Sequence, residues 1–411
     1  MADYDIVVVG GGPAGLAAAI EAKKNGIDNL LLLERENELG GILQQCIHYG
    51  FGLHLFNEEL TGPEYAERFI NELKDLGIEY KTDSMVLDIS PNKEVSYINT
   101  IDGFKTITAK AVILAMGCRE NTRGAVGIPG SRPSGVFTAG TAQRFVNIEG
   151  YMIGKKVVIM GTGDVGLIMA RRLALEGAEV KAVMARKPYP GGLMRNVVQC
   201  LHDYDIPLLL CHTITSIAGK DRIEGVTVVK LDETGAIIPG TEEFMECDTL
   251  LLSVGLIPEN ELSIKAGVEM DRGSKGPKVN ESRETSVEGI FACGNVLHVH
   301  DIADYVTEES YIAGKAAADY VKGHKKSSDS VIKVKPGSGV GYILPHTINL
   351  RKINDNIELF FRVNKLYKDV RLLVKINGNI IKTKKKKRVY PGEMETFKIK
   401  AETLKANDAS V

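Results

Sequence analysis

Apolar and polar residues along the chain fall into blocks that predict strands and helices in turn. Residues 5–9 form a short apolar, β-branched run, a glycine-rich turn follows, and residues 13–20 form a helix of small residues. A second apolar run at residues 29–33 completes a strand–helix–strand unit. This order of elements is typical of the start of a right-handed parallel sheet.

The same pattern occurs a second time. An apolar run at residues 156–160 leads into a glycine turn at 161–166, a helix at 167–175 and a strand at 179–184. We therefore expect an α/β fold with two Rossmann-like dinucleotide-binding units. Other expected elements are a helix at 64–76, a β-meander over about 78–108 with a hairpin turn at Asp102-Gly103, strands at 111–115, 226–230, 249–253 and 289–295, and a helix at 303–321.

The pattern changes after residue 322. Residues 323–330 have the composition of a linker. Short alternating strands follow at 342–350, 357–363 and 371–376, and Asn377-Gly378 signals a hairpin turn. We expect a small all-β module at residues 331–405.

Composition limits the classes of function. With 411 residues, 44% of them hydrophobic, the chain has room for two or three globular domains. A net charge of −2 argues against a nucleic-acid binder, which needs a basic face. No apolar run approaches the length of a membrane span, and the acidic N-terminus does not resemble a signal peptide. The six cysteines, which include no Cys-x-x-Cys pair, indicate a reducing, cytoplasmic setting; they are Cys46, Cys118, Cys200, Cys211, Cys247 and Cys293.

The first glycine turn carries a dinucleotide fingerprint. Gly10 allows the tight turn, Gly12 lets backbone N–H groups approach a pyrophosphate, and Gly15 lets helix and strand pack closely. Glu34 ends the second strand, where a carboxylate can accept hydrogen bonds from both ribose hydroxyls of an adenosine. The sequence thus predicts a nucleotide site, with a structural turn that binds no ligand as the alternative.

The second glycine turn, formed by Gly161, Gly163 and Gly166, repeats the fingerprint. Two copies indicate either two dinucleotide sites or one site and a degenerate copy.

The acid that follows the first turn is missing after the second. Ala185 stands where Glu34 would have its counterpart, and Arg186 and Lys187 come next. These cations could pair with a 2′-phosphate, which would indicate NADPH. The alternative is a solvated basic loop beside a weak or non-selective site.

Five motifs in order resemble the two-dinucleotide-domain flavoprotein reductases, the pyridine nucleotide-disulfide oxidoreductase type. They are the two fingerprints, Met116-Gly117, Val254-Gly255-x-x-Pro258 and Cys293-Gly294-Asn295. The resemblance covers about residues 4–322 and implies FAD on the first unit and NAD(P)H on the second, which is inserted in the first. It implies an FAD-binding domain at 1–117 and 265–325 and an NAD(P)-binding domain at 118–264.

The resemblance also implies the residues of both sites. Val86 would touch the adenine, Gly41 and Gln44 the flavin, and Gly294 and Asn295 the ribityl and pyrophosphate region. Asn295 stands where the family usually has aspartate; it keeps an acceptor and adds donors but loses the charge. The full FAD set is Gly10, Gly12, Pro13, Ala14, Gly15, Glu34, Gly41, Gln44, Val86, Gly117, Gly294 and Asn295, and the NAD(P)H set is Gly161, Gly163, Gly166 and Arg186.

A narrower resemblance concerns the loop 40–48 and the segment 188–192. Both are similar to the flavin subunits of glycerol-3-phosphate, opine and sarcosine type oxidoreductase complexes, and the β-rich tail is similar to the extension of the glycerol-3-phosphate-linked members. Such subunits accompany a separate FAD-dependent dehydrogenase and a small cysteine-rich subunit. The resemblance therefore implies an electron-transfer subunit in a hetero-oligomer.

Cys46 and His48 are the candidate catalytic residues. A thiol near a flavin could form a charge-transfer pair or support peroxide chemistry, which makes a stand-alone NAD(P)H oxidase or peroxidase the alternative function. Without a Cys-x-x-Cys partner the disulfide-reductase mechanism lacks its second sulfur, and Cys46 could simply pack near the flavin. His48 is either a proton donor or a hydrogen-bonding residue of the loop. A third possibility is a flavin-bearing structural subunit with an inactive second site.

Two further clusters have open roles. His298, His300 and Asp301 could ligate a metal, but we expect them to be polar groups near the outer edge of the flavin, and we expect no metal. The run Lys384–Arg388 could dock an acidic partner, with a solvated hairpin as the alternative. Nucleic-acid binding is not expected, since no aromatic residues are interleaved with these cations.

Overall fold

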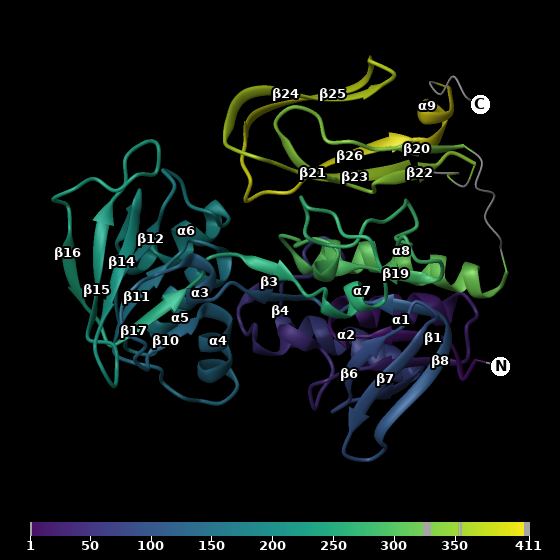
Figure 1. Cartoon of the computed structure of the whole chain (residues 1–411), viewed down its shortest axis with the longest axis horizontal. Helices are drawn as coiled ribbons and strands as arrows, with labels where there is room; N and C mark the ends of the chain where they lie inside the picture. The colour runs from purple at the N-terminus through teal and green to yellow at the C-terminus, as the bar shows by residue number, and fades with distance from the viewer. Residues whose placement is uncertain (1, 324–329, 352, 354–355, 407–411) are drawn as a thin grey trace. The chain divides into compact units, whose positions relative to one another are not determined.

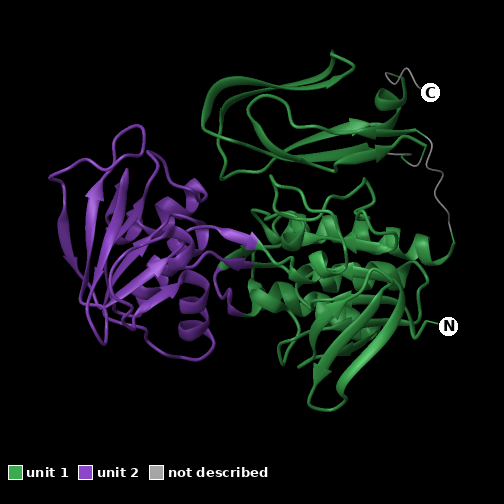
Figure 2. Cartoon of the chain, in the orientation of Figure 1, with its two compact units in different colours: residues 1–44, 49–118, 258–411 green, residues 45–48, 119–257 purple. Residues whose placement is uncertain are grey.

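The computed structural model describes residues 2–323, 330–351, 353 and 356–406, and its contacts divide the chain into two compact units (Figure 2). Unit 1 comprises residues 1–44, 49–118 and 258–411, and unit 2 comprises residues 45–48 and 119–257. The predicted linker lies outside the described residues, apart from its ends Gly323 and Ser330. No helix of the described part combines the length and apolar character needed to cross a bilayer.

Unit 1 is built on a seven-stranded sheet in the order β5-β2-β1-β8-β7-β6, with β19 paired to β8 (Figure 1). The strands from β5 to β8, together with β19, are parallel, whereas β6, β7 and β8 form an antiparallel meander. The strands are β1 (Tyr4–Val9), β2 (Leu30–Leu33), β5 (Glu79–Lys81), β6 (Met85–Ile89), β7 (Glu94–Asn99), β8 (Gly103–Leu114) and β19 (Ile290–Ala292).

The predicted meander at 78–108 is confirmed for β6 to β8 and is wrong for residues 79–81. These form β5, which pairs in parallel with β2. The strand predicted at 111–115 is the end of the 12-residue strand β8, which leaves the meander and enters the parallel sheet beside β1. Local alternation could not reveal this, because one strand belongs to both parts of the sheet.

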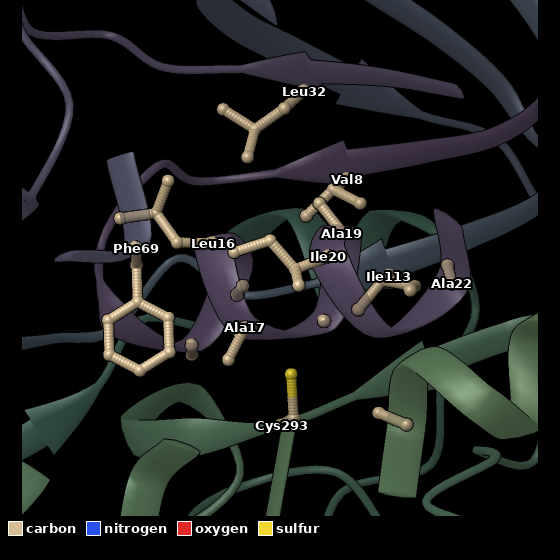
Figure 3. Packing of buried hydrophobic residues seen from close by; sticks show 14 of the residues in the cluster. Val8, Leu16, Ala17, Ala19, Ile20, Ala22, Leu32, Phe69, Ile113 and Cys293 are labelled. Atoms are coloured by element: carbon tan, nitrogen blue, oxygen red, sulfur yellow. The ribbon is translucent and has the colours of Figure 1, made fainter. Parts of the chain in front are cut away.

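Helices cover the sheet of unit 1 because each has a buried face. In α2 (Gly62–Asp75), Tyr65, Phe69 and Leu73 repeat at helical spacing and are buried, and Thr61 forms a capping box with Glu64. Figure 3 shows apolar side chains of α1 packed among residues of the sheet and of α2. The other elements of this part are α1 (Pro13–Lys24), α7 (Glu261–Lys265), α8 (Ala303–Val321), the 3₁₀ helices η1 (Gly41–Gln45) and η3 (Gly294–Val296), and the strands β3 (Tyr49–Phe51) and β4 (Leu60–Thr61).

Small residues let α1 and α8 pack closely. A Cβ atom on Gly314 of α8 would lie 2.3 Å from the carbonyl oxygen of Ala18 in α1. Their first turns both lie beside Gly294, since a Cβ atom there would be 2.7 Å from Cβ of Ala14 and 3.2 Å from Cγ1 of Val306.

Unit 2 repeats the parallel arrangement in a five-stranded sheet of order β10-β17-β11-β12-β13, and it adds the antiparallel sheet β14-β15-β16. The parallel strands are β10 (Val136–Thr138), β11 (Lys156–Met160), β12 (Glu179–Ala185), β13 (Leu208–Leu210) and β17 (Thr249–Leu252). The other elements are β14 (His212–Ala218), β15 (Gly225–Lys230), β16 (Glu243–Glu246), α3 (Arg123–Val126), α4 (Ala139–Asn147), α5 (Asp164–Leu175), α6 (Met194–Cys200) and η2 (His202–Tyr204). The strands β9 (Cys118–Glu120) and β18 (Leu256–Pro258) carry the chain out of unit 1 and back.

The C-terminal region is rich in β-structure, as predicted, and ends in the short helix α9 (Ala401–Ala406). Pro345, which cannot donate a ladder hydrogen bond, separates two strands where the sequence predicted one. The strands are β20 (Val331–Lys333), β21 (Val340–Leu344), β22 (Thr347–Asn349), β23 (Asn356–Val363), β24 (Tyr367–Ile376), β25 (Asn379–Val389) and β26 (Glu395–Lys400). The predicted fold class is confirmed: an α/β chain with two Rossmann-like sheets and a C-terminal β-rich region.

Candidate functional site

Two glycines of the first turn are required by the packing of the protein itself. Gly10 follows β1 with φ +108°, and a Cβ atom there would lie 2.4 Å from the carbonyl oxygen of Ala115. A Cβ atom on Gly15 would lie 1.7 Å from the carbonyl oxygen of Gly10. These positions let the turn fold tightly and let α1 approach the sheet.

Gly12 differs, because the protein does not fill the space beside it. A Cβ atom on Gly12 would meet only the Cα atom of Gly41, at 3.9 Å. Gly12 is the N-cap of α1 and provides no side-chain cap, and Pro13 occupies the first turn. The uncapped N–H groups and the positive end of the helix dipole, next to open space, fit an anionic pyrophosphate.

Glu34 lies directly after β2 and is buried beside the glycine turn. Its Oε2 accepts a 2.6 Å hydrogen bond from the N–H of Gly11, and its Oε1 accepts one of 2.8 Å from the N–H of Glu36. Each carboxylate oxygen keeps a second lone pair for a ribose hydroxyl. The N–H of Ser84 donates to the carbonyl of Glu34, which brings the start of β6, with half-buried Val86, to this side of the turn.

The turn after β19 packs against the first turn of α1. Gly294 has φ +71°, and a Cβ atom there would lie 2.7 Å from the Cβ of Ala14 and 3.2 Å from Cγ1 of Val306 in α8. The structure thus brings Gly294 to the predicted pyrophosphate turn from a position 280 residues away in the sequence.

Asn295 and Gly117 lie near one another through Cys118. The Nδ2 of Asn295 is 3.6 Å from the sulfur of Cys118, and its Oδ1 accepts a 2.9 Å hydrogen bond from the N–H of His300. Asn295 therefore closes the loop that follows the turn. Gly117, with φ +74°, accepts a hydrogen bond from the N–H of Glu259 at the start of the return segment.

The predicted FAD residues therefore converge on one region of unit 1. The side chain of Gln44 is the exception. Its Nε2 donates a 2.6 Å hydrogen bond to the carbonyl of Leu39, so the side chain folds back onto its own loop. Gly41, with φ +57°, faces Gly12 instead.

A buried ionic cluster supports the Gly294 turn, and sequence reasoning missed its centre. Oε1 of Glu309, on α8, accepts from Nε of Arg283 at 2.9 Å and from Nε2 of His298 at 3.2 Å. Oε2 accepts from Nε2 of His300 at 3.0 Å and from the N–H of Gly294 at 3.1 Å. One carboxylate with four hydrogen bonds thus fixes the turn to α8. Its signal in the sequence was a charged residue on the apolar, small-residue face of the helix, where it needs partners.

The environment of the cluster fixes its protonation. Burial, reinforced by His300, lowers the pKa of His298 to about 4, so this imidazole is neutral at pH 7. Burial by itself would raise the pKa of Glu309, but His298, His300 and Arg283 outweigh it and hold the pKa well below its usual range. Arg283 and Glu309 form a buried ion pair in this cluster.

The cluster also has the spacing of a metal triad. The ligand atoms of His298, His300 and Glu309 lie within 4.8 Å of one another. However, Arg283 already bonds to the carboxylate, so a metal cation would be repelled by a buried guanidinium and would share its only anion. Asp301, which the sequence grouped with these histidines, accepts hydrogen bonds from Arg362 and from the N–H of Met394 instead.

The C-terminal region covers this loop. Arg362 of β23 bonds to Asp301 and, at 2.9 Å, to the carbonyl of Val299. The ring of Phe360 lies 5.7 Å from that of His298 and 6.2 Å from that of His300. The β-rich region is thus attached to the segment that directly follows the Gly294 turn.

The second glycine turn, in unit 2, repeats the first in its geometry. Gly161 has φ +105°, and a Cβ atom there would lie 1.9 Å from the carbonyl oxygen of Ser253, which takes the place that Ala115 has in unit 1. A Cβ atom on Gly166 would lie 2.6 Å from Cβ of Ser253, and one on Gly163 would lie 3.1 Å from its Oγ. The duplication seen in the sequence is therefore a structural one.

The loop that contains residues 188–192 is bonded to this second turn. Oγ1 of Thr162 accepts from the N–H of Gly191 at 2.9 Å. Oδ1 of Asp164 accepts from the N–H of Leu193 at 2.8 Å and from Nδ2 of Asn196 at 2.6 Å. The loop and the first turn of α5 are therefore one connected structure.

Ala185 occupies the place that Glu34 has in unit 1, because the register of β11 with β12 matches that of β1 with β2. Arg186 and Lys187 follow at the carboxyl end of β12, and both are exposed. The acid of the first unit is thus replaced by an apolar residue followed by two cations.

Cys46 and His48 belong to unit 2 by their contacts. The thiol of Cys46 is 3.9 Å from Oε1 of Gln143 on α4, and Nδ2 of Asn147 donates to the carbonyl of Gln45 at 2.9 Å. Burial raises the pKa of the Cys46 thiol to about 12, so the nucleophilic thiolate is disfavoured at neutral pH. All six cysteines are free.

Comparison with known proteins gives matches along most of the chain. The profile of the family "Pyridine nucleotide-disulphide oxidoreductase" matches residues 4–318. A thioredoxin reductase of Listeria monocytogenes is 25% identical over 334 residues, which cover 80% of this chain and 97% of the reductase. The glutamate synthase (NADPH) small chain of Halomonas elongata is 25% identical over 350 residues, which cover 78% of this chain and 68% of the relative.

Among solved structures, thioredoxin reductase of T. acidophilum shares the fold with a TM-score of 0.64 at 23% identity, over 78% of this chain and 99% of the reductase. The family profile spans both glycine turns and the Gly294 turn and ends before β20. Members of the family typically bind FAD and NAD(P)H. The chain belongs to the pyridine nucleotide-disulphide oxidoreductase family of enzymes.

Proposed function

We propose that this chain is an FAD-dependent NAD(P)H oxidoreductase that serves as the electron-transfer subunit of a dehydrogenase complex. The observation that carries the proposal is the pair of glycine turns on two parallel sheets, in a chain that has no Cys-x-x-Cys motif. Such a chain can exchange electrons between a nicotinamide and a flavin but has no redox-active dithiol loop to pass them on. The next electron carrier is then another protein.

The FAD site is assigned to unit 1, where the predicted domain 1–117 and 265–325 contributes the sheet and α8. The uncapped start of α1 beside Gly12 fits the pyrophosphate, and Glu34 holds acceptors for a ribose. When bound, FAD supplies a flavin that takes up a hydride. The residues of the chain do the rest: Glu309 fixes the Gly294 turn, and Asn295 orders the loop that follows it.

The NAD(P)H site is assigned to the turn Gly161–Gly166 in the predicted domain 118–264. Ala185 stands at the position that corresponds to Glu34, so no carboxylate lies beside Arg186 and Lys187 in the sequence. Two cations without this acid favour a nucleotide with a 2′-phosphate. We therefore propose a preference for NADPH.

The partner is proposed to be a separate FAD-dependent dehydrogenase of the glycerol-3-phosphate type, together with a small cysteine-rich subunit. The loops 40–48 and 188–192 and the β-rich tail are the features on which this rests. One relative is itself called the small chain of glutamate synthase, which supports a role as one chain of a larger enzyme. Six free cysteines fit the reducing, cytoplasmic setting that the sequence predicts.

The alternative, a self-contained oxidase or peroxidase that uses Cys46, has less support. Its nucleophile would have to be a thiolate, and the raised pKa of Cys46 opposes this form.

Stopped-flow reduction of the purified flavoprotein tests the proposal. We expect NADPH to reduce the flavin faster than NADH does. We expect Arg186→Glu to lower the rate of reduction by NADPH about tenfold or more and to change the rate with NADH little. Equal effects on both nucleotides would refute the NADPH preference. A flavin that neither nucleotide reduces would refute the oxidoreductase itself, and peroxide turnover that Cys46→Ser abolishes would favour the alternative.

A further inference from the structure

The hairpin of β24 and β25 has a strongly one-sided charge. Its residues 367–389 include nine lysines and arginines and one aspartate, although the whole chain has a net charge of −2. Among the described strands, these two pair only with each other, and they reverse at Asn377-Gly378 (Figure 1). A hairpin that merely had to stay solvated would mix both signs of charge.

One face of the hairpin turns inward and is neutralised. Leu372 and Val374 pack on the core of the C-terminal region. On the opposite strand, Lys384 and Lys386 reach the buried carboxylate of Glu395 on β26, at 3.5 and 2.9 Å. The basic run therefore has two faces, and these two lysines of the inward face have a structural role.

Four other cations are exposed on the outward face. Arg371 is the cross-strand neighbour of Lys385, and Lys375 and Lys387 lie an even number of positions from them along the same two strands. Like charges in these positions destabilise a hairpin. Among the described residues, none of the four forms an ion pair. Protection of strand edges would account for one or two cations, but not for a face that is basic on both strands.

Apolar side chains lie among these cations. Leu373 is 44% exposed and Ile380 is 57% exposed. Exposed aliphatic residues framed by arginine and lysine are typical of a protein interface, where the apolar groups supply affinity and the charges steer association. Tyr367, at the base of the hairpin, is its only aromatic residue, so a stacking surface for single-stranded nucleic acid is missing.

We propose that this outer face, formed by Arg371, Leu373, Lys375, Ile380, Lys385 and Lys387, is the docking surface for an acidic protein, the partner dehydrogenase subunit. The assignment of the partner rests on the proposed function. The docking surface belongs to the region whose Arg362 and Phe360 contact the loop after the Gly294 turn, so the partner would bind to the part of unit 1 that is attached to the flavin site.

The test uses the full-length holoprotein with Lys375→Glu, Lys385→Glu and Lys387→Glu combined. This variant turns the like-charged pair of Arg371 and Lys385 into an opposite-charged pair. Its thermal melting curve is compared with that of the wild-type chain, so that a loss of binding through unfolding is recognised. The control variant combines Lys74→Glu, Lys105→Glu and Lys220→Glu, three exposed lysines elsewhere that change the net charge equally.

The companion chains are first isolated with the tagged chain from its own cells and identified by mass spectrometry. If no flavin-dependent dehydrogenase is among them, the proposed function fails. If one is, its purified form is titrated with the three proteins. We expect the hairpin variant to raise Kd by about tenfold or more, and the control variant by less than about twofold.

An unchanged Kd for the hairpin variant would overturn the docking surface and leave the proposed function standing. Labelled single-stranded DNA and vesicles with about 30% phosphatidylserine serve as competing probes. If the wild-type chain binds either of them more tightly than it binds the dehydrogenase, and the hairpin variant loses that binding, the docking proposal is wrong as well.

Discussion

At the scale of single residues, the three glycines of the first turn have different physical reasons to be glycine. Gly10 and Gly15 are dictated by backbone conformation and close packing inside the protein. Gly12 has an ordinary negative φ of −77° and open space beside it, so the fold alone does not require it. The proposed pyrophosphate, which would approach the backbone here, accounts for a glycine at this position.

This difference gives a matched pair of variants. Gly12→Ala is expected to leave the melting temperature of the FAD-free protein unchanged and to weaken FAD binding by about tenfold or more, because the new methyl group occupies the space for the pyrophosphate. Gly15→Ala is expected to cost about 3 kcal/mol or more in the free energy of unfolding, because its Cβ atom clashes with the carbonyl of Gly10. Thermal melts and FAD titration measure both quantities. Unweakened FAD binding in Gly12→Ala would contradict the assignment of the turn.

Glu309 provides a second test at this scale. Glu309→Gln removes the anion that balances Arg283, and an unpaired buried guanidinium is expected to cost about 3–5 kcal/mol. The double variant Glu309→Gln with Arg283→Met should recover a large part of this loss, because no charge is left buried. Denaturant unfolding measures the effect. A single variant as stable as the wild type would show that the cluster does not hold the Gly294 turn.

At the scale of elements, the sequence predicted the regular pieces well and their partners less well. α8 has the predicted bounds, and β1, α1 and β2 follow the apolar pattern, because burial on one or both faces leaves a periodic signal. The sequence did not predict the pairing of β5 with β2 or the membership of β8 in both parts of the sheet, because strand pairing depends on residues far apart in the chain. Pro345 lies inside the strand that the sequence predicts at 342–350, although it separates β21 from β22.

The loop after the Gly294 turn makes stability depend on pH. His298 is neutral in the folded chain, with a pKa of about 4, whereas an ordinary histidine has a pKa of 6.5. Between pH 6.5 and 4, His298 is protonated in the unfolded chain but not in the folded chain. Its contribution to the free energy of unfolding is therefore fully present above pH 6.5 and is lost as the pH falls toward 4. The expected loss is about 3 kcal/mol for this group.

Urea unfolding between pH 7 and 4.5 measures this loss, and His298→Gln is the control, because glutamine can donate to Glu309 but does not titrate. We expect the wild-type chain to lose more stability than the variant over this range. Parallel curves for the two proteins would show that His298 is not the group responsible.

At the scale of the whole molecule, the chain belongs to a family named for disulphide chemistry but carries no Cys-x-x-Cys motif. Desolvation raises the pKa of the half-buried Cys46 thiol to about 12, which disfavours its thiolate at neutral pH. Under the proposed function, electrons taken from a nicotinamide leave through a partner or an added acceptor and not through a local dithiol.

From this we expect the flavoprotein to reduce a one-electron dye with NADPH while it fails to reduce thioredoxin. The fitting comparison is a thioredoxin reductase assayed at equal flavin concentration. A thioredoxin-dependent rate within about tenfold of that enzyme would contradict the relay function and would require a dithiol formed by cysteines distant in the sequence.

The sequence by itself determined the local features of this protein: two glycine turns, each after an apolar strand and before a small-residue helix, and the replacement of an acid by Ala185 in the second copy. Such features follow from residues a few positions apart, where conformation and spacing are fixed by the chain itself. The tertiary structure alone decided which distant residues meet. It placed Gly294 on Ala14, put Glu309 rather than Asp301 beside two histidines, and divided the basic run of β25 into a paired inner face and an unpaired outer one. These contacts depend on strand order and helix packing. Both bring together residues far apart in the chain, so they produce no periodic pattern in the sequence.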